Sequence, residues 1–193
     1  TYPGLRVLLL QPTFKPGPNE FITDNAGKPL EKNPLLDVKV RQALSLSINR
    51  KAIVDRVLQS TVTEANQWMP KGSFGYNPEV KDIAYNPEQA KKLLAEAGFP
   101  QGFQIAIHVP GDRYPQAPET VQAVAQFWSR IGVKTKVEVV PWAVYSSRAN
   151  KNEYAVSVIA WGNGTGEAGY GLLQTLTTPC LLYTSDAADD TPC

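Results

Sequence analysis

Apolar positions follow two regular spacings through the second half of the chain. They occupy alternate positions over 103–109 and over 133–140, and a mostly apolar run fills 155–160. Alternation predicts strands, and a short apolar run bounded by turn residues predicts a buried strand. Helical spacing over 119–131 and a Pro-Trp start at 141–149 predict two intervening helices. This order predicts parallel strands joined by right-handed crossovers, and therefore an α/β fold.

The first half opens with a short predicted strand and continues into helices with clear start signals. A strand is predicted over 5–10, and the proline- and glycine-rich stretch 11–35 predicts an irregular excursion on the surface. Asp37 and Asn49 are suitable N-caps for two amphipathic helices. Over 86–98 an Asn-Pro pair begins a third helix and a glycine ends it. Together these elements predict a mixed, mostly parallel sheet flanked by helices.

The last fourteen residues differ from everything before them. Segment 180–193 holds both cysteines of the chain, three of its 18 acidic residues and no basic residue. Its beginning, CLLYTSDAADD, resembles the translation of a transposase adapter rather than a natural coding sequence. We expect the native sequence to stop near Pro179 and 180–193 to be a non-native tail. The codons of residues 180–190 decide between this tail and an unusual natural terminus.

Composition and charge exclude several classes of function. The chain is 42% apolar and 19% charged, as in ordinary globular proteins, and no run of eighteen apolar residues predicts a membrane span. Without 180–193 the net charge is 19 bases minus 15 acids, or +4, and the bases are scattered. This pattern does not indicate a nucleic-acid-binding protein. Because residues 1–179 contain no cysteine, no disulfide framework is expected.

The stretch that follows the run 155–160 is the first candidate ligand site. The run ends at Trp161 and Gly162, and a glycine-rich loop then carries the amide of Asn163 and the carboxylate of Glu167. In open α/β sheets, ligands bind in the crevice at the carboxyl ends of the strands. An aromatic face with a few polar groups and accessible backbone is therefore predicted to contact a ligand there.

Two further groups of residues follow the other predicted strands, at the same expected edge of the sheet. Arg113 and Tyr114 follow the strand 103–109, and Trp142 and Tyr145 follow the strand 133–140. An arginine can hold a carboxylate through two parallel hydrogen bonds, although a surface ion pair is an equally good interpretation of Arg113. The aromatic residues fit a ligand wall or the hydrophobic core.

Catalytic interpretations receive less support from the residues. Gly164 to Gly169 spell G-x-G-x-x-G after a predicted strand, which favours a nucleotide-dependent enzyme as the alternative function. Ribose binding requires an acidic residue about twenty positions after the glycines, and here the acidic residues at that distance all lie in 180–193. The motif also follows the last predicted strand of the sheet rather than the first. His108 is the single histidine and has no nucleophile motif to serve, so a packed or surface strand position is expected. A structural or interaction domain without a small-molecule site is a third possibility, and no metal or cofactor is expected.

Several motifs in a fixed order carry a resemblance to a known family. The chain resembles the family 5 extracytoplasmic solute-binding proteins of ABC importers, the peptide-, dipeptide- and nickel-binding group. The matching segments are the helix pair 36–44 and 49–53, the block 75–78 with 85–99, the segment 130–133, and the strand end at Trp161 and Gly162.

This resemblance implies a binding protein rather than an enzyme. Members have two lobes joined by a hinge, with the ligand held between the lobes, and the closed form docks on a membrane permease. Residues 1–179 are then most of one lobe, from a monomeric protein of the periplasm or the extracytoplasmic membrane surface. Peptide-binding members hold extended ligands through backbone hydrogen bonds and hydrated pockets.

The resemblance also implies roles for individual residues. Trp161 matches the aromatic residue that ends the ligand-facing strand, and Arg113 matches an arginine that binds the ligand's carboxylate in some dipeptide binders. Trp142 and Tyr145 match a segment that borders the cleft. Peptide binders commonly place an aspartate where this chain has Gly164, so either Glu167 replaces it or the solute lacks a free amine. Sugars, opine-like compounds and other organic solutes therefore stay open beside peptides.

Overall fold

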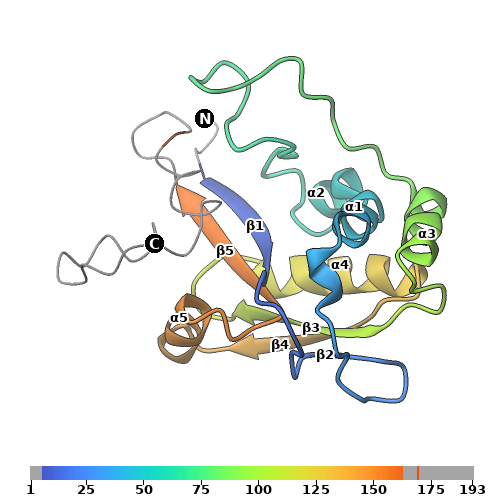
Figure 1. The fold of residues 1–193 in the computed structure, drawn as a ribbon. Helices are drawn as coiled ribbons and strands as arrows, with labels where there is room; N and C mark the ends of the chain where they lie inside the picture. The colour runs from blue at the N-terminus through green and yellow to red at the C-terminus, as the bar shows by residue number, and fades with distance from the viewer. Residues whose placement is uncertain (1–5, 163–168, 170–193) are drawn as a thin grey trace, which may run out of the picture. The chain divides into compact units, whose positions relative to one another are not determined.

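The computed structural model describes residues 6–162 and residue 169 (Figure 1). The chain divides into two compact units. The larger unit comprises residues 9–64 and 83–159, and the smaller unit comprises residues 1–8, 65–82 and 160–193. In the described part of the chain, no helix combines the length and the apolar character that crossing a membrane requires.

A five-stranded sheet organises the fold around its central strand β3 (Gln104–Pro110). β4 (Lys134–Val140) pairs with β3 in parallel along its whole length. β5 (Val156–Gly162) also pairs with β3 in parallel and has β1 (Arg6–Pro12) on its other side. The short β2 (Ile22–Thr23) pairs antiparallel with the start of β3. The predicted mixed, mostly parallel sheet is confirmed.

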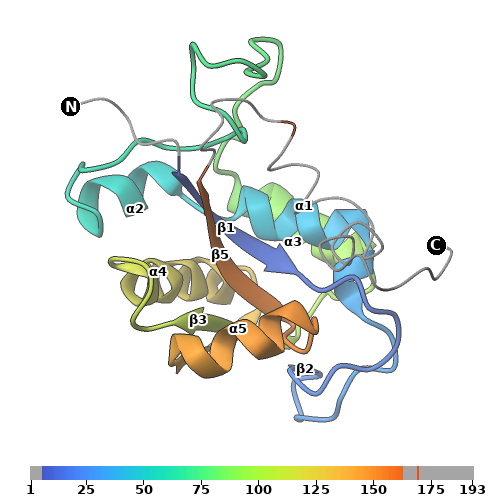
Figure 2. The same cartoon turned by 90° about the vertical axis from the view of Figure 1, so that its left-hand side faces the viewer.

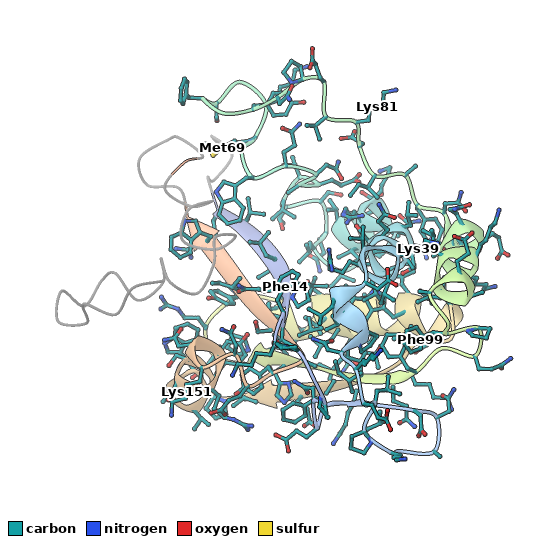
Figure 3. All side chains as sticks on the ribbon, in the orientation of Figure 1. Phe14, Lys39, Met69, Lys81, Phe99 and Lys151 are labelled. Carbon is teal, nitrogen blue, oxygen red and sulfur yellow. The ribbon has the colours of Figure 1, made fainter. Side chains whose placement is uncertain are left out.

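The helices cover both faces of this sheet, and Figure 2 shows β3 between α4 and α5. The helical elements are η1 (Pro34–Leu36), α1 (Val38–Leu46), α2 (Arg50–Arg56), α3 (Pro87–Glu96), α4 (Ala117–Arg130) and α5 (Trp142–Asn150). Lys39 of α1, labelled in Figure 3, forms an ion pair with Glu96 of α3 at 2.9 Å. α1 and α3 therefore lie side by side.

Side-chain alternation along β3 assigns the two faces of the sheet. Ile107 and Val109 belong to the main hydrophobic cluster, together with Val121 and Trp128 of α4. His108 points to the opposite face, because successive strand residues alternate. It is only 3% exposed there. The alternating sequence of β3 thus belongs to a strand that is buried on both faces, and His108 is packed.

The helix starts follow the predicted capping chemistry. The side chain of Asp37 accepts a hydrogen bond from the backbone N–H of Lys39, and that of Asn86 accepts one from Gln89. Asn49 caps α2 in the same manner. Each bond satisfies an N–H that the first turn of a helix leaves free. These three predictions are confirmed.

The segment 11–35 corrects part of one prediction. We expected an irregular surface excursion, and most of the segment is irregular and exposed or half-buried, but Ile22 and Leu35 are 1% and 0% exposed, and Ile22 pairs with β3. The Asn33 amide donates to the carbonyl oxygens of Thr13 and Lys15, both at 3.0 Å, and its oxygen caps η1. A proline-rich segment can be packed when a buried side chain satisfies its backbone groups in this way.

The smaller unit contains a connecting loop between Gln67 and Asn77. The Gln67 side chain donates to the carbonyl oxygen of Asn77 and accepts from its N–H, at 2.8 and 3.0 Å. This pair of bonds closes the loop at its base. Met69 lies within it and is only 2% exposed.

Candidate functional site

The carboxyl ends of β3 and β4 meet at one edge of the sheet, since the two strands are parallel and in register. The N–H of Gly111, directly after β3, donates to the carbonyl oxygen of Val140 at the end of β4, at 3.1 Å. The loop after β3 and the start of α5 are therefore neighbours. This edge holds Arg113, Tyr114 and Trp142, as the sequence predicts.

Asp112 fixes this loop to the first residue of α5, a role that sequence analysis missed. Its Oδ1 accepts a hydrogen bond from the backbone N–H of Trp142, at 2.8 Å. Pro141, the N-cap of α5, has no side-chain oxygen to make a capping bond. The sequence did hold a signal for this role: a helix that starts after Pro141 has a free N–H in its first turn, which an acceptor from elsewhere must satisfy.

Arg113, Tyr114 and Trp142 form a compact group at this edge. The guanidinium carbon of Arg113 lies 5.0 Å from the centroid of the Trp142 ring, within the range of a cation–π contact. Tyr114 meets the same ring edge to face, at 6.1 Å. Arg113 is exposed, and residues of the segment 111–119 line an open depression of about 360 Å³. This arrangement can receive a carboxylate beside an aromatic face.

Tyr145 has a different role from the ligand contact that the sequence predicts. It is 2% exposed, and its ring stacks on that of Trp142 at 5.9 Å. Its hydroxyl is hydrogen-bonded to the backbone of Val158, and burial raises the pKa of this phenol above its usual value. A buried ring whose hydroxyl is already bonded offers no surface to a ligand, so Tyr145 supports Trp142 instead.

The aromatic contacts continue from Tyr145 into the interior of the larger unit. Tyr154 stacks on Tyr145 at 5.3 Å and on His108 at 4.0 Å, and Phe21 meets the imidazole edge to face at 4.5 Å. The guanidinium of Arg148 lies over the Tyr154 ring at 5.0 Å and pairs with Glu153 at 2.7 Å. The row of rings thus connects the buried imidazole with the half-buried ring of Trp142.

This histidine is unsuited to proton transfer at neutral pH. Burial is the main cause that lowers the pKa of His108 to about 4; Glu138 opposes this shift, and the charges of Arg148 and Lys136 add to it. Its Nδ1 has no hydrogen-bond partner in the described part of the chain. Over the same residues, no cluster of His, Cys, Asp or Glu has the geometry to hold a metal ion.

The remaining predicted site residues are only partly described. Trp161 is half-buried and Gly162 is exposed, and both belong to the smaller unit. Asn163 and Glu167 lie outside the described residues, as do residues 164–168 of the glycine motif. That Trp161 and Arg113 border one ligand site therefore stays a prediction.

Comparison with known proteins identifies the class of this chain. The sequence model described as "Bacterial extracellular solute-binding proteins, family 5 Middle" matches residues 2–179. The chain therefore belongs to family 5 of the bacterial extracellular solute-binding proteins, as the resemblance implied.

Individual relatives agree with this assignment. The chain is 38% identical to the heme-binding protein A of Haemophilus influenzae over 140 residues, which cover 71% of this chain and 26% of the relative. It is 36% identical to the dipeptide-binding protein of Escherichia coli over 141 residues, 72% of this chain and 26% of the relative. The chain thus spans about a quarter of the length of these relatives.

A solved structure confirms the fold. The structure of HbpA2 from Haemophilus parasuis superposes with a TM-score of 0.66 at 35% identity, covering 84% of this chain and 31% of that chain. These matches are to solute-binding proteins, and they give no support to the nucleotide-dependent enzyme suggested by the glycine motif.

Proposed function

We propose that this chain is part of the substrate-binding component of an ABC importer, which captures a peptide or a similar small organic solute between two lobes. The protein then delivers the solute to permease subunits in the membrane. The observation that carries the proposal is the exposed Arg113 guanidinium over the Trp142 ring, at the carboxyl edge of the parallel strands. Membership of family 5 supports it.

The proposed mechanism requires binding energy and no chemical step. A solute that contacts both lobes favours the closed form, because those contacts exist together only after closure. Arg113 contributes a charge-assisted pair of hydrogen bonds to a carboxylate, and the Trp142 ring contributes an apolar wall. The protein returns its solute unchanged, so we propose that it is not an enzyme.

Carboxylate-bearing solutes are the class that this site favours. The relatives at 38% and 36% identity are named for heme and for dipeptides, and both of these ligands carry carboxylates. Gly164 stands where peptide binders commonly have an aspartate for the ligand's amine. Glu167 replaces that aspartate if the solute is a peptide, and a solute without an amine needs no replacement.

Domain organisation and location form part of the same proposal. Residues 1–179 constitute most of one lobe of a monomeric protein that works in the periplasm or at the extracytoplasmic membrane surface. Segment 180–193 is a non-native tail. The family match ends at residue 179, which supports this boundary. Natural codons over 180–190, unlike the adapter, would contradict it.

Replacing Arg113 tests the proposed carboxylate contact. In the complete protein that contains this lobe, Arg113→Ala is expected to weaken binding of alanyl-leucine about tenfold, because a hydrogen-bonded charge loses its partner. Arg113→Lys keeps the charge but not the two-pronged geometry, so we expect an intermediate loss. Isothermal titration calorimetry measures both.

Arg130 provides a matched control on the same protein. Its guanidinium lies over the Phe127 ring at 5.2 Å, nearly the geometry of Arg113 over Trp142, but at the far end of α4. Arg130→Ala therefore removes a similar cation–π contact away from the site and should leave affinity unchanged. Equal losses in Arg113→Ala and Arg130→Ala would contradict the proposed site.

A further inference from the structure

β5 stops pairing with the central strand β3 before either strand ends. The backbone pairing of β5 with β3 consists of Val156 with Ile107 and Ser157 with His108. Both strands continue beyond these pairs, β3 to Pro110 and β5 to Gly162. The next rung of β3 falls on Pro110, which has no N–H, so the carbonyl oxygen of the next β5 residue on the side of β3 lacks a donor there.

Val158 is that residue. The carbonyl oxygen of Ala155 accepts from Thr13 N–H at 2.9 Å and so points towards the β1 side. Because backbone groups alternate between the two sides of a strand, those of Val158 point away from β1. Val158 is fully buried, so water does not satisfy them.

The hydroxyl of Tyr145 is hydrogen-bonded to both backbone groups of Val158. It donates to the carbonyl oxygen of Val158 and accepts from the N–H of the same residue, each at 2.6 Å. A phenol can make both bonds at once, as it is one donor and also an acceptor. One side chain of α5 thus supplies the donor that Pro110 of β3 cannot supply, and also an acceptor for the N–H of the same residue.

The position of this hydroxyl is fixed by packing. Its ring stacks between those of Trp142 at 5.9 Å and Tyr154 at 5.3 Å, with interplanar angles of 26° and 27°. The side chain is 2% exposed. Close packing against these two rings holds the hydroxyl at β5.

We infer that Tyr145 is a positioning residue that anchors the outgoing half of β5 to α5 through Val158. The Trp142 ring, which stacks on Tyr145, depends on the same contact for its direction. That this direction matters for solute binding rests on the proposed function. The anchor between Tyr145 and Val158 is independent of that function.

Hydrogen exchange of backbone amides in Tyr145→Phe tests the anchor without any ligand. We expect the amide of Val158 to exchange about ten- to a hundredfold faster, and those of residues 159–162 to lose protection with it, because the two buried bonds are gone. The amides of β4 should keep their rates. A role in global stability alone would speed exchange throughout the core by one common factor, and that result would overturn the inference.

Tyr154→Phe is the matched control. Tyr154 is also 2% exposed and stacks on the same ring, but its hydroxyl has no hydrogen-bond partner among the described residues. Removing that hydroxyl should leave the exchange of Val158 unchanged. If Tyr145→Phe does not fold, the wild-type rate still decides, because exchange of Val158 as fast as an exposed amide would contradict the anchor.

A second measurement separates the anchor from the proposed function. In the complete protein, Tyr145→Phe is expected to weaken binding of alanyl-leucine about fivefold, while Tyr154→Phe leaves it unchanged. Unchanged affinity in Tyr145→Phe, in a protein that does bind, would overturn the positioning role. If wild-type protein binds none of the tested solutes, the proposed function fails, and the exchange result still decides the anchor.

Discussion

Replacing Gly102 with alanine is expected to destabilise the chain by at least about 3 kcal/mol. The added Cβ would stand 1.9 Å from the carbonyl oxygen of Gly132, a backbone atom that a rotamer change cannot move. Gly102 also has a φ of +68°, in the left-handed region. Relief of the clash would separate the starts of β3 and β4, where Lys134 N–H donates to the carbonyl oxygen of Phe103 at 2.9 Å.

Gly98 gives a control with the same backbone requirement and no clash. Its φ is +90°, and no atom lies within 4 Å of where its Cβ would stand. Gly98→Ala should therefore cost only the left-handed strain, about 1 kcal/mol. Urea denaturation of both variants measures the difference. Equal losses would show that the close approach of Gly102 to Gly132 is not a constraint on the fold.

Lowering the pH from 7 to 5 is expected to destabilise the chain by about 2 kcal/mol through His108 alone. Burial lowers the pKa of His108 to about 4 in the folded chain, whereas an unfolded histidine titrates near 6.5. Between these two pKa values, His108 is protonated in the unfolded chain and neutral in the folded chain. The stability contributed by the neutral imidazole is therefore complete above pH 6.5 and decreases as the pH falls towards 4.

The surroundings of the imidazole explain why it stays neutral. It stacks on the ring of Tyr154 and meets the ring of Phe21 edge to face, and its Nδ1 has no hydrogen-bond partner among the described residues. The charged groups that act on it are Glu138 and Lys136 of β4 and Arg148 of α5. Glu138 alone favours the protonated form, and it pairs with Lys136.

Thermal or urea unfolding at pH 7 and pH 5 measures this dependence. Because His108 is the single histidine of the chain, His108→Phe should remove most of it and should keep an aromatic ring in the stack. The carboxylates that titrate near pH 4 act mainly below this range. A variant as sensitive to pH between 7 and 5 as the wild-type chain would contradict the assignment.

Elements set by local chemistry were predictable from the sequence. Asp37, Asn49 and Asn86 cap helices through bonds to residues two or three positions away, so their signals are local. The parallel pairing of β3 with β4 follows from the helix between them. These predictions needed no knowledge of distant contacts.

Features set by distant contacts were not predictable in this way. The packing of 11–35 depends on Asn33, whose bonds reach back 18 and 20 residues. At the candidate site, Asp112 reaches Trp142 across 30 positions, and the Tyr145 hydroxyl finds Val158 only once the sheet has formed. Sequence patterns placed Arg113 and Trp142 at one edge. They did not show that Tyr145 faces the interior.

Calorimetric titration of the complete protein with alanyl-leucine, heme and NAD tests the central claim most directly. If this lobe belongs to a carrier of carboxylated solutes, alanyl-leucine or heme should bind at a single saturable site, weaken in Arg113→Ala, and be recovered chemically unchanged. Tight binding of NAD with no binding of the carboxylated solutes, or binding that Arg113→Ala does not alter, would contradict the account.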